Sequence, residues 1–290
     1  MKRSLVFSGW LLLLPWIATF LIFWFFPLIY SFILSLTNYR LLAPETQWVG
    51  WANYARLFAD PDFLTSLANS AIFVVGTIPV TTVISLGLAL LVNNRFPGRA
   101  IFRAAYFLPS ITAMVVIALI FSNLYARDGY LYLLARMIGL SPPAEGFLLS
   151  DKTALVSIMA MDVWTASGYY MLVFLGGLQT IPDELYDAAR IAGASRWQQF
   201  RHVTLPMLRP VMLFVIVINS IKSFQVFVEI FVMTKGGPLN STLTGVYFVY
   251  ETGLRRFDFG YASAAAYVIF LIIALISIVQ FKFLKTGWTA

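Results

Sequence analysis

The sequence predicts an all-α, polytopic membrane protein with about six transmembrane helices, in a single domain of residues 1–290. The first observation is composition: 60% of the 290 residues are hydrophobic and only 11% are charged, whereas soluble domains carry roughly 25% charged residues. The second is that long stretches of the chain contain no charge at all. The third is the absence of cysteine together with a single histidine, His202. These features exclude a soluble enzyme, a disordered chain and a disulfide-stabilised secreted domain.

The charge-free stretches place four of the helices. Residues 4–39 and 63–94 contain no charge over 36 and 32 residues, and they predict the first two spans. Residues 104–126 and 259–281 are each charge-free for 23 residues and predict the third and the sixth. About 20 apolar residues cross a bilayer as a helix, so each stretch is long enough.

Two further apolar stretches are interrupted by a few charges. The fourth span contains Asp162, and the fifth contains Lys222 and Glu229. The six predicted spans cover residues 9–36, 67–93, 103–125, 154–179, 207–234 and 260–283.

The distribution of basic residues predicts the orientation, because cytoplasmic segments of membrane proteins are enriched in Lys and Arg. With the N-terminus inside, the inner segments hold 11 basic and three acidic residues, and the outer segments hold eight of each. The inner side is then +8 and the outer side 0. We therefore expect both termini in the cytoplasm, and we attribute the chain's net +7 to topology and not to nucleic-acid binding.

The sequence offers little that could perform catalysis. It contains no phosphate-binding loop, no His-Glu-x-x-His motif and no nucleophile elbow. We expect a transporter or channel component that is not an enzyme, and whose energy comes from outside the chain.

The predicted inner loop at residues 181–206 has the pattern of two short helices. Pro182 suits a first helical position, and Gly193 suits the left-handed residue that ends a helix. Ser195 and Gln198 form a capping-box pattern for the second helix, and Pro206 is expected to begin the fifth span. By itself this pattern is equally compatible with a solvated connector and with a surface that binds a partner.

The same loop resembles the cytoplasmic loop of permease subunits in binding-protein-dependent ABC importers. The family motif is Glu-Ala-Ala, then Gly, then Leu-Pro, and the corresponding residues here are Asp187, Ala188, Ala189, Gly193, Leu205 and Pro206. Further segments resemble the carbohydrate-uptake branch, and in particular the first of the two permeases of maltose-type importers. These segments are Phe107-Leu108-Pro109, Gly236-Gly237-Pro238 and the stretch from Asp258 to Ala264.

The resemblance implies the type I ABC importer permease fold in a bacterial or archaeal plasma membrane. It implies a second permease, a pair of ATPase subunits, an extracytoplasmic sugar-binding protein and a sugar or oligosaccharide substrate. ATP and magnesium belong to the ATPase, so the chain itself needs no cofactor. The loop is expected to transmit ATPase closure to the membrane helices. Asp187 stands where the family motif has Glu, which shortens the carboxylate by one methylene group.

Three charged residues lie within predicted spans, where each costs several kcal/mol unless it faces protein or water (about 2.5–3.5 on insertion scales). On the fifth span, Asn219, Lys222, Ser223 and Glu229 share an arc of about 120°. Two interpretations follow from the residues: a structural Asp162–Lys222 ion pair, or a surface that contacts sugar.

The resemblance favours the sugar-contacting surface. It implies that substrate is contacted by residues on the two spans that flank the loop, where Ala166 and Val226 match the family's positions without offering a polar group. The predicted substrate-binding residues are Asp162, Thr165, Tyr169, Asn219, Lys222, Ser223 and Glu229.

The alternative class is a secondary transporter or channel that uses Asp162, Lys222 and Glu229 as an ion relay. Such proteins usually contain repeated halves with broken helices, and the sequence shows neither.

Overall fold

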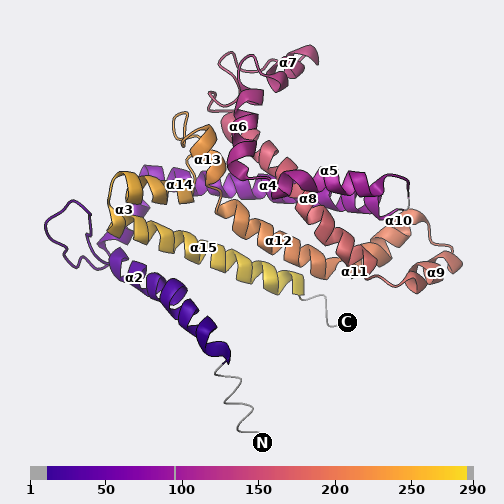
Figure 1. The fold of residues 1–290 in the computed structure, drawn as a ribbon, viewed down its shortest axis with the longest axis horizontal. Helices are drawn as coiled ribbons and strands as arrows, with labels where there is room; N and C mark the ends of the chain where they lie inside the picture. Colours follow the sequence, from indigo (N-terminus) through magenta and orange to yellow (C-terminus); the bar gives the residue numbers. More distant parts are fainter. Residues whose placement is uncertain (1–11, 95, 286–290) are drawn as a thin grey trace, which may run out of the picture. The chain divides into compact units, whose positions relative to one another are not determined.

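The computed structural model describes residues 12–94 and 96–285, and its named secondary-structure elements are helices (Figure 1). From Leu12, the first described residue, a helix runs through the first π-helical turn into α2. The elements, with π-helical turns labelled η, are η1 (Leu21–Phe25), α2 (Phe26–Ser35), α3 (Ala52–Ala59), α4 (Pro61–Asn93), α5 (Arg99–Ile111), α6 (Met114–Tyr125), α7 (Tyr130–Met137), α8 (Ala154–Gln179), α9 (Asp183–Ile191), α10 (Arg196–Gln199), η2 (Phe200–Thr204), α11 (Leu205–Met207), α12 (Arg209–Phe224), α13 (Val228–Met233), α14 (Gly245–Tyr250), η3 (Glu251–Arg255) and α15 (Phe259–Lys285).

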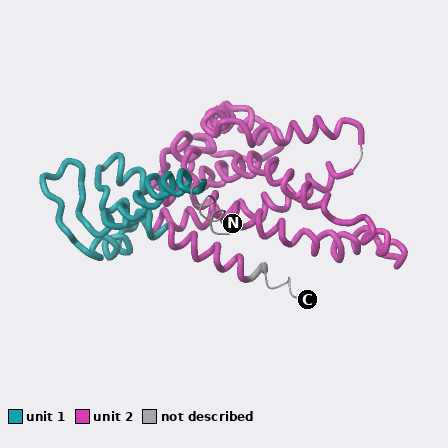
Figure 2. Tube along the Cα trace, turned by 60° about the horizontal axis from the view of Figure 1, so that its bottom comes forward, with its two compact units in different colours: residues 1–63, 248–269 teal, residues 64–247, 270–290 magenta. Residues whose placement is uncertain are grey.

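Packing divides the chain into two compact units, which Figure 2 colours separately. Unit 1 comprises residues 1–63 and 248–269. Unit 2 comprises residues 64–247 and 270–290, and it contains the loop between α8 and α12.

Five helical segments within the described residues are long and apolar enough to cross a membrane. They are Leu12–Ser35, Pro61–Asn93, Ala154–Gln179, Arg209–Met233 and Phe259–Lys282. Four agree with predicted spans as continuous helical segments, although residues 9–11 of the first prediction lie outside the described residues. The helix α4 begins six residues before the predicted 67, because the Asp60 carboxylate accepts a hydrogen bond from the Asp62 amide (2.9 Å) and Pro61 suits a first helical position.

The prediction of one continuous helix over residues 103–125 is wrong. The helices α5 and α6 meet there at an angle of 97°, with Thr112 and Ala113 extended between them. Pro109 lies in the last turn of α5 and has no amide hydrogen to donate. If α5 and α6 are counted together as one bent span, the described residues contain six candidate spans instead of five.

The predicted fifth span is also interrupted. The helix α12 ends at Phe224 and α13 begins at Val228, which leaves residues 225–227 outside either helix. The Thr244 hydroxyl donates to the Val226 carbonyl at 3.2 Å, so a side chain satisfies a backbone group that the break has freed.

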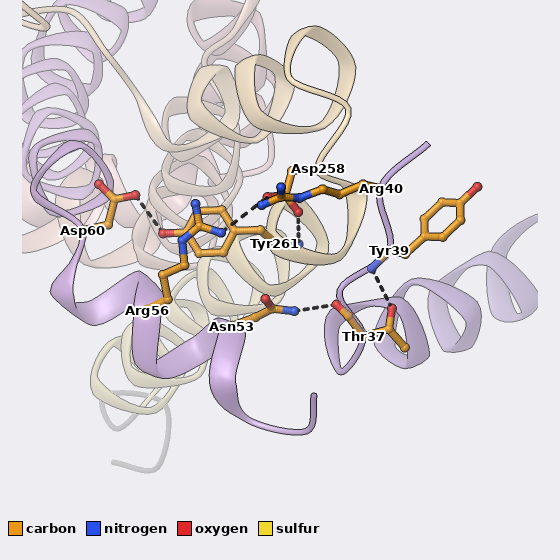
Figure 3. A network of polar contacts seen from close by, with 8 residues as sticks. All are labelled: Thr37, Tyr39, Arg40, Asn53, Arg56, Asp60, Asp258 and Tyr261. Carbon is orange, nitrogen blue, oxygen red and sulfur yellow. Dashed lines mark hydrogen bonds and ion pairs between the residues drawn. The ribbon is translucent and has the colours of Figure 1, made fainter. Parts of the chain in front are cut away.

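In unit 1, a polar network joins residues 37–60 to the start of α15 (Figure 3). Asp258 accepts from Arg40 at 3.0 Å and from Arg56 at 3.4 Å. The Arg56 guanidinium lies 4.0 Å from the centre of the Tyr261 ring, and the Tyr261 hydroxyl donates to Asp60 at 2.8 Å. These contacts give a structural role to the segment from Asp258 to Ala264.

In unit 2, α5 lies alongside α8 at very short range (Figure 1). A methyl group placed on Gly168 would lie 1.8 Å from the Tyr106 carbonyl oxygen, so only glycine permits this approach. The Ser110 hydroxyl donates to the Thr165 carbonyl at 2.8 Å and adds a polar contact between the same two helices. An apolar core lies beside this contact, with residues from α4, α8, α12 and the turn before α12, and includes Tyr170, Phe174, Leu178, Leu208 and Val215.

Candidate functional site

A cavity of about 570 Å³ lies within unit 2. Its walls come from α4, α5, the start of α6, the middle of α8, the end of α12, the break that follows α12 and the start of α13. The residues that line it are Phe73, Phe107, Ser110, Ile111, Met114, Asp162, Thr165, Ala166, Tyr169, Tyr170, Asn219, Lys222, Ser223, Gln225, Val226, Phe227, Val228 and Glu229.

The structure brings all seven predicted substrate-binding residues to this cavity. They are Asp162, Thr165, Tyr169, Asn219, Lys222, Ser223 and Glu229. Helical spacing explains the place of six of them, because residues three and four apart lie on the same face of α8 and of α12, whereas Glu229 reaches the cavity from α13, beyond the break. The three intramembrane charges therefore face a cavity, where water or a ligand can solvate them, instead of lipid.

Two lining residues present buried polar atoms that lack a hydrogen-bond partner among the described residues. These atoms are the side-chain nitrogen of Asn219 and the hydroxyl of Tyr170. A buried polar atom without a partner costs about 1–3 kcal/mol. A ligand or water that hydrogen-bonds to these atoms would remove that cost.

Two of the predicted hydroxyls are already engaged within the protein. The Thr165 hydroxyl donates to the Met161 carbonyl in its own helix at 2.9 Å. The Ser223 hydroxyl lies 3.3 Å from the Thr77 hydroxyl of α4. Their donor capacity is therefore partly used before any ligand arrives, whereas the amide of Asn219 keeps an unused donor.

Lys222 does not pair directly with Asp162. Ion pairs within 4.0 Å in the described part of the chain include those of Arg40 and Arg56 with Asp258, of Arg190 with Asp187, and of Arg255 with Glu251. The ammonium nitrogen of Lys222 lies instead 5.1 Å from the centre of the Tyr169 ring, in cation–π contact. Asp162 and Lys222 are therefore not in direct ionic contact in this structure.

Several lining residues were not predicted from the sequence. Phe107 and Ser110 reach the cavity from α5, beside the bend. Pro109 is a sequence signal for that bend, since proline kinks or ends helices. Gln225 and Phe227 reach the cavity from the break after α12, which contains neither proline nor glycine.

The loop between α8 and α12 forms two short helices, as predicted. Gly193 has φ +79°, and the amides of Gly193 and Ala194 bond back to the carbonyls of Arg190 and Ala189 at 3.0 and 2.9 Å. This double closure is a Schellman motif, which a left-handed glycine permits. The predicted capping box is also confirmed, with the Ser195 amide 2.7 Å from the Gln198 side-chain oxygen and the Gln198 amide 3.3 Å from the Ser195 hydroxyl.

Two details of the loop differ from the prediction. Pro182 is the extended residue before α9 and not its first helical residue, because its ψ of 135° lies outside the helical range. Pro206 lies inside the short helix α11, and the long helix α12 begins only at Arg209. The π-helical turn η2 carries the chain from α10 into α11 without a break.

The predicted coupling residues lie mainly on the surface of this loop. Asp187, Ala188 and Gly193 are exposed, and Asp187 pairs with Arg190. Ala189, Leu205 and Pro206 are half-buried. The neighbouring Ile191 and Trp197 side chains are 89% and 66% exposed, so the surface offers apolar contacts as well as charge.

Comparison with known proteins agrees with this architecture. Residues 81–285 match the family described as the binding-protein-dependent transport system inner membrane component. The lactose transport system permease protein LacF of Rhizobium radiobacter is 35% identical over 97% of this chain and 95% of its own length. The arabinooligosaccharides transport system permease protein AraP of Bacillus subtilis is 33% identical over 92% of this chain and 85% of its own length.

The fold also matches a solved transporter. A chain of a bacterial alginate ABC transporter, in complex with its alginate pentasaccharide-bound periplasmic protein, superposes with a TM-score of 0.81. The match covers 98% of this chain and 94% of the other at 22% identity, which supports the fold and confirms the predicted all-helical permease architecture. Because the family match covers most of the chain, and relatives above 30% identity match nearly all of it, this chain belongs to the binding-protein-dependent transport system inner membrane components, the permease subunits of ABC transporters.

Proposed function

We propose that this chain is one of two permeases in an ATP-driven saccharide importer of a prokaryotic plasma membrane, and that the cavity in unit 2 binds the saccharide during transport. The observation that carries the proposal is the gathering of seven polar or aromatic residues from α8, α12 and α13 around one cavity. Relatives that transport lactose and arabinooligosaccharides supply the substrate class.

The chemistry of the cavity suits a saccharide. Carboxylates accept hydrogen bonds from sugar hydroxyls, and the side-chain nitrogen of Asn219 can donate to a sugar oxygen. The rings of Phe107 and Tyr169 offer apolar faces against which the C–H face of a sugar can pack. The volume, about 570 Å³, lies within the range of roughly 300–1,000 Å³ that is typical of small-molecule sites.

The partners that we propose are a second permease, two ATPase subunits and an extracytoplasmic binding protein. The loop helix α9 would contact an ATPase through its exposed face, which includes Asp187, Ala188 and Ile191. Both termini would then lie in the cytoplasm together with this loop. The ion-relay alternative loses its support, since the family to which the chain belongs uses a separate energy source.

The proposal is tested with Asn219→Ala and Tyr169→Ala in the complete transporter, reconstituted in liposomes with radiolabelled lactose and other saccharides. Each change removes a hydrogen bond or a stacking surface worth about 1–2 kcal/mol. We expect uptake per folded complex to fall roughly five- to thirtyfold.

Asn94→Ala is the matched control, because Asn94 is exposed and its side chain bonds to the end of the preceding helix α4, at the Leu90 carbonyl (3.1 Å). Uptake at the level of this control by both cavity variants would show that the cavity does not bind substrate.

A further inference from the structure

One side chain of α9 points inward and reaches the helical segment that leads into α12. The Tyr186 hydroxyl lies 3.0 Å from the Thr204 hydroxyl, within hydrogen-bond distance. Thr204 belongs to η2 and is 4% exposed, so its hydroxyl has little access to water. The two hydroxyls therefore satisfy one another across the loop.

Apolar packing continues from this hydrogen bond into unit 2. Tyr186 and Val203 pack against a buried cluster that contains Leu178, Ile181 and Leu208. The same cluster extends along α8 to Tyr170, which lines the cavity. Packed side chains thus connect α9 to the cavity without interruption.

The remaining surface of α9 faces outward. Asp183, Glu184, Asp187 and Arg190 are exposed, and so is Ile191. A partner that moves α9 would bind to this outer face. Such a displacement would reach α12 through the inner face, where Tyr186 provides a directional contact.

We propose that Tyr186 is a positioning residue that couples movement of α9 to α12 through its hydrogen bond with Thr204. The inference rests on the proposed function, in which an ATPase contacts α9. It assigns the polar link between loop and membrane helix to one pair of hydroxyl groups. The aromatic ring holds α9 against the core, and the hydroxyl fixes the position of α9 relative to η2.

The test uses Tyr186→Phe and Thr204→Val, which remove one hydroxyl each and keep nearly the same volume. The complete complex is reconstituted with its ATPase and its loaded binding protein, and the ratio of saccharide imported to ATP hydrolysed is measured. We expect this ratio to fall roughly three- to tenfold in each variant, about the effect of losing one net hydrogen bond. The double variant should be no worse than the singles, because both remove the same bond.

Two further variants separate coupling from simple loss of structure. Thr204→Ser keeps the hydroxyl and should restore the ratio. Thr180→Val removes a hydroxyl that bonds within the end of α8, to the Gly177 carbonyl at 2.8 Å, and should leave the ratio at the wild-type value.

A wild-type ratio in both Tyr186→Phe and Thr204→Val would overturn the inference. So would loss of the ATPase subunits from the purified variants, because the residues would then serve assembly. Failure of the wild-type complex to import any saccharide would count against the proposed function itself, and is therefore distinguished from failure of the coupling inference.

Discussion

Gly193 is the residue whose backbone decides how α9 ends. Its φ of +79° lies in the left-handed region, and a methyl group added there would meet nothing within 4 Å. The constraint is therefore conformational and not steric. A β-branched residue in this region costs roughly 1–2 kcal/mol or more.

We predict that Gly193→Val distorts the end of α9 and lowers saccharide uptake per complex roughly tenfold, while the complex still assembles. Gly193→Asn is the matched control, because asparagine tolerates the left-handed region better than other residues with a side chain. Uptake and substrate-stimulated ATP hydrolysis in liposomes provide the measurement. Equal, undiminished activity in both variants would mean that the loop acts only as a connector.

Seven of the residues that line the candidate site were predicted from the sequence, in part from helical spacing on the fifth span and in part from the family resemblance. Asn219, Lys222 and Ser223 share an arc of α12, and the cavity lies on that arc. Phe107 and Ser110 were missed because their approach depends on a close contact between α5 and α8. That contact is a tertiary property, and the periodicity of either helix alone does not encode it.

At the scale of the elements, the approach of α5 to α8 depends on Gly168. We predict that Gly168→Ala strongly destabilises the protein, because the new methyl group would lie 1.8 Å from the Tyr106 carbonyl oxygen. The cost of such overpacking is about 1–3 kcal/mol or more. Thermal unfolding of the purified protein in detergent measures the effect.

Gly176→Ala in the same helix is the control, since a methyl group there would meet nothing within 4 Å. It should leave the unfolding temperature unchanged or raise it, because alanine favours helix. Similar unfolding temperatures for the two variants would contradict the close packing of α5 on α8.

The uninterrupted helices are the elements that the sequence predicts well. The predicted fourth span, residues 154–179, has the same bounds as α8. The bend at Thr112 and the break at residues 225–227 were not predicted, because apolar composition continues through both. The second break depends in part on a hydrogen bond from Thr244, a residue 18 positions away from Val226.

For the whole molecule, the charge distribution predicts topology. The chain contains no cysteine, so single cysteines can be introduced without background labelling. We predict that cysteines at positions 50, 140 and 239 react with an impermeant maleimide in intact cells, and that one at position 195 reacts only after the membrane is opened. The prediction follows from the +8 charge of the inner segments. Labelling of position 195 from outside would show that the orientation is opposite to the predicted one.

The close contact at Gly168 has a mechanical consequence for transport. Sliding α5 along α8 would drive side chains into the gap that now holds only a hydrogen atom, and would break the bond from Ser110 to the Thr165 carbonyl. We therefore expect α5 and α8 to move together as one rigid body. Another part of the cavity wall is formed by residues 225–227, where the helix between α12 and α13 is interrupted. If the cavity changes width during transport, we expect the movement to occur at this interruption and not by sliding of α5 along α8.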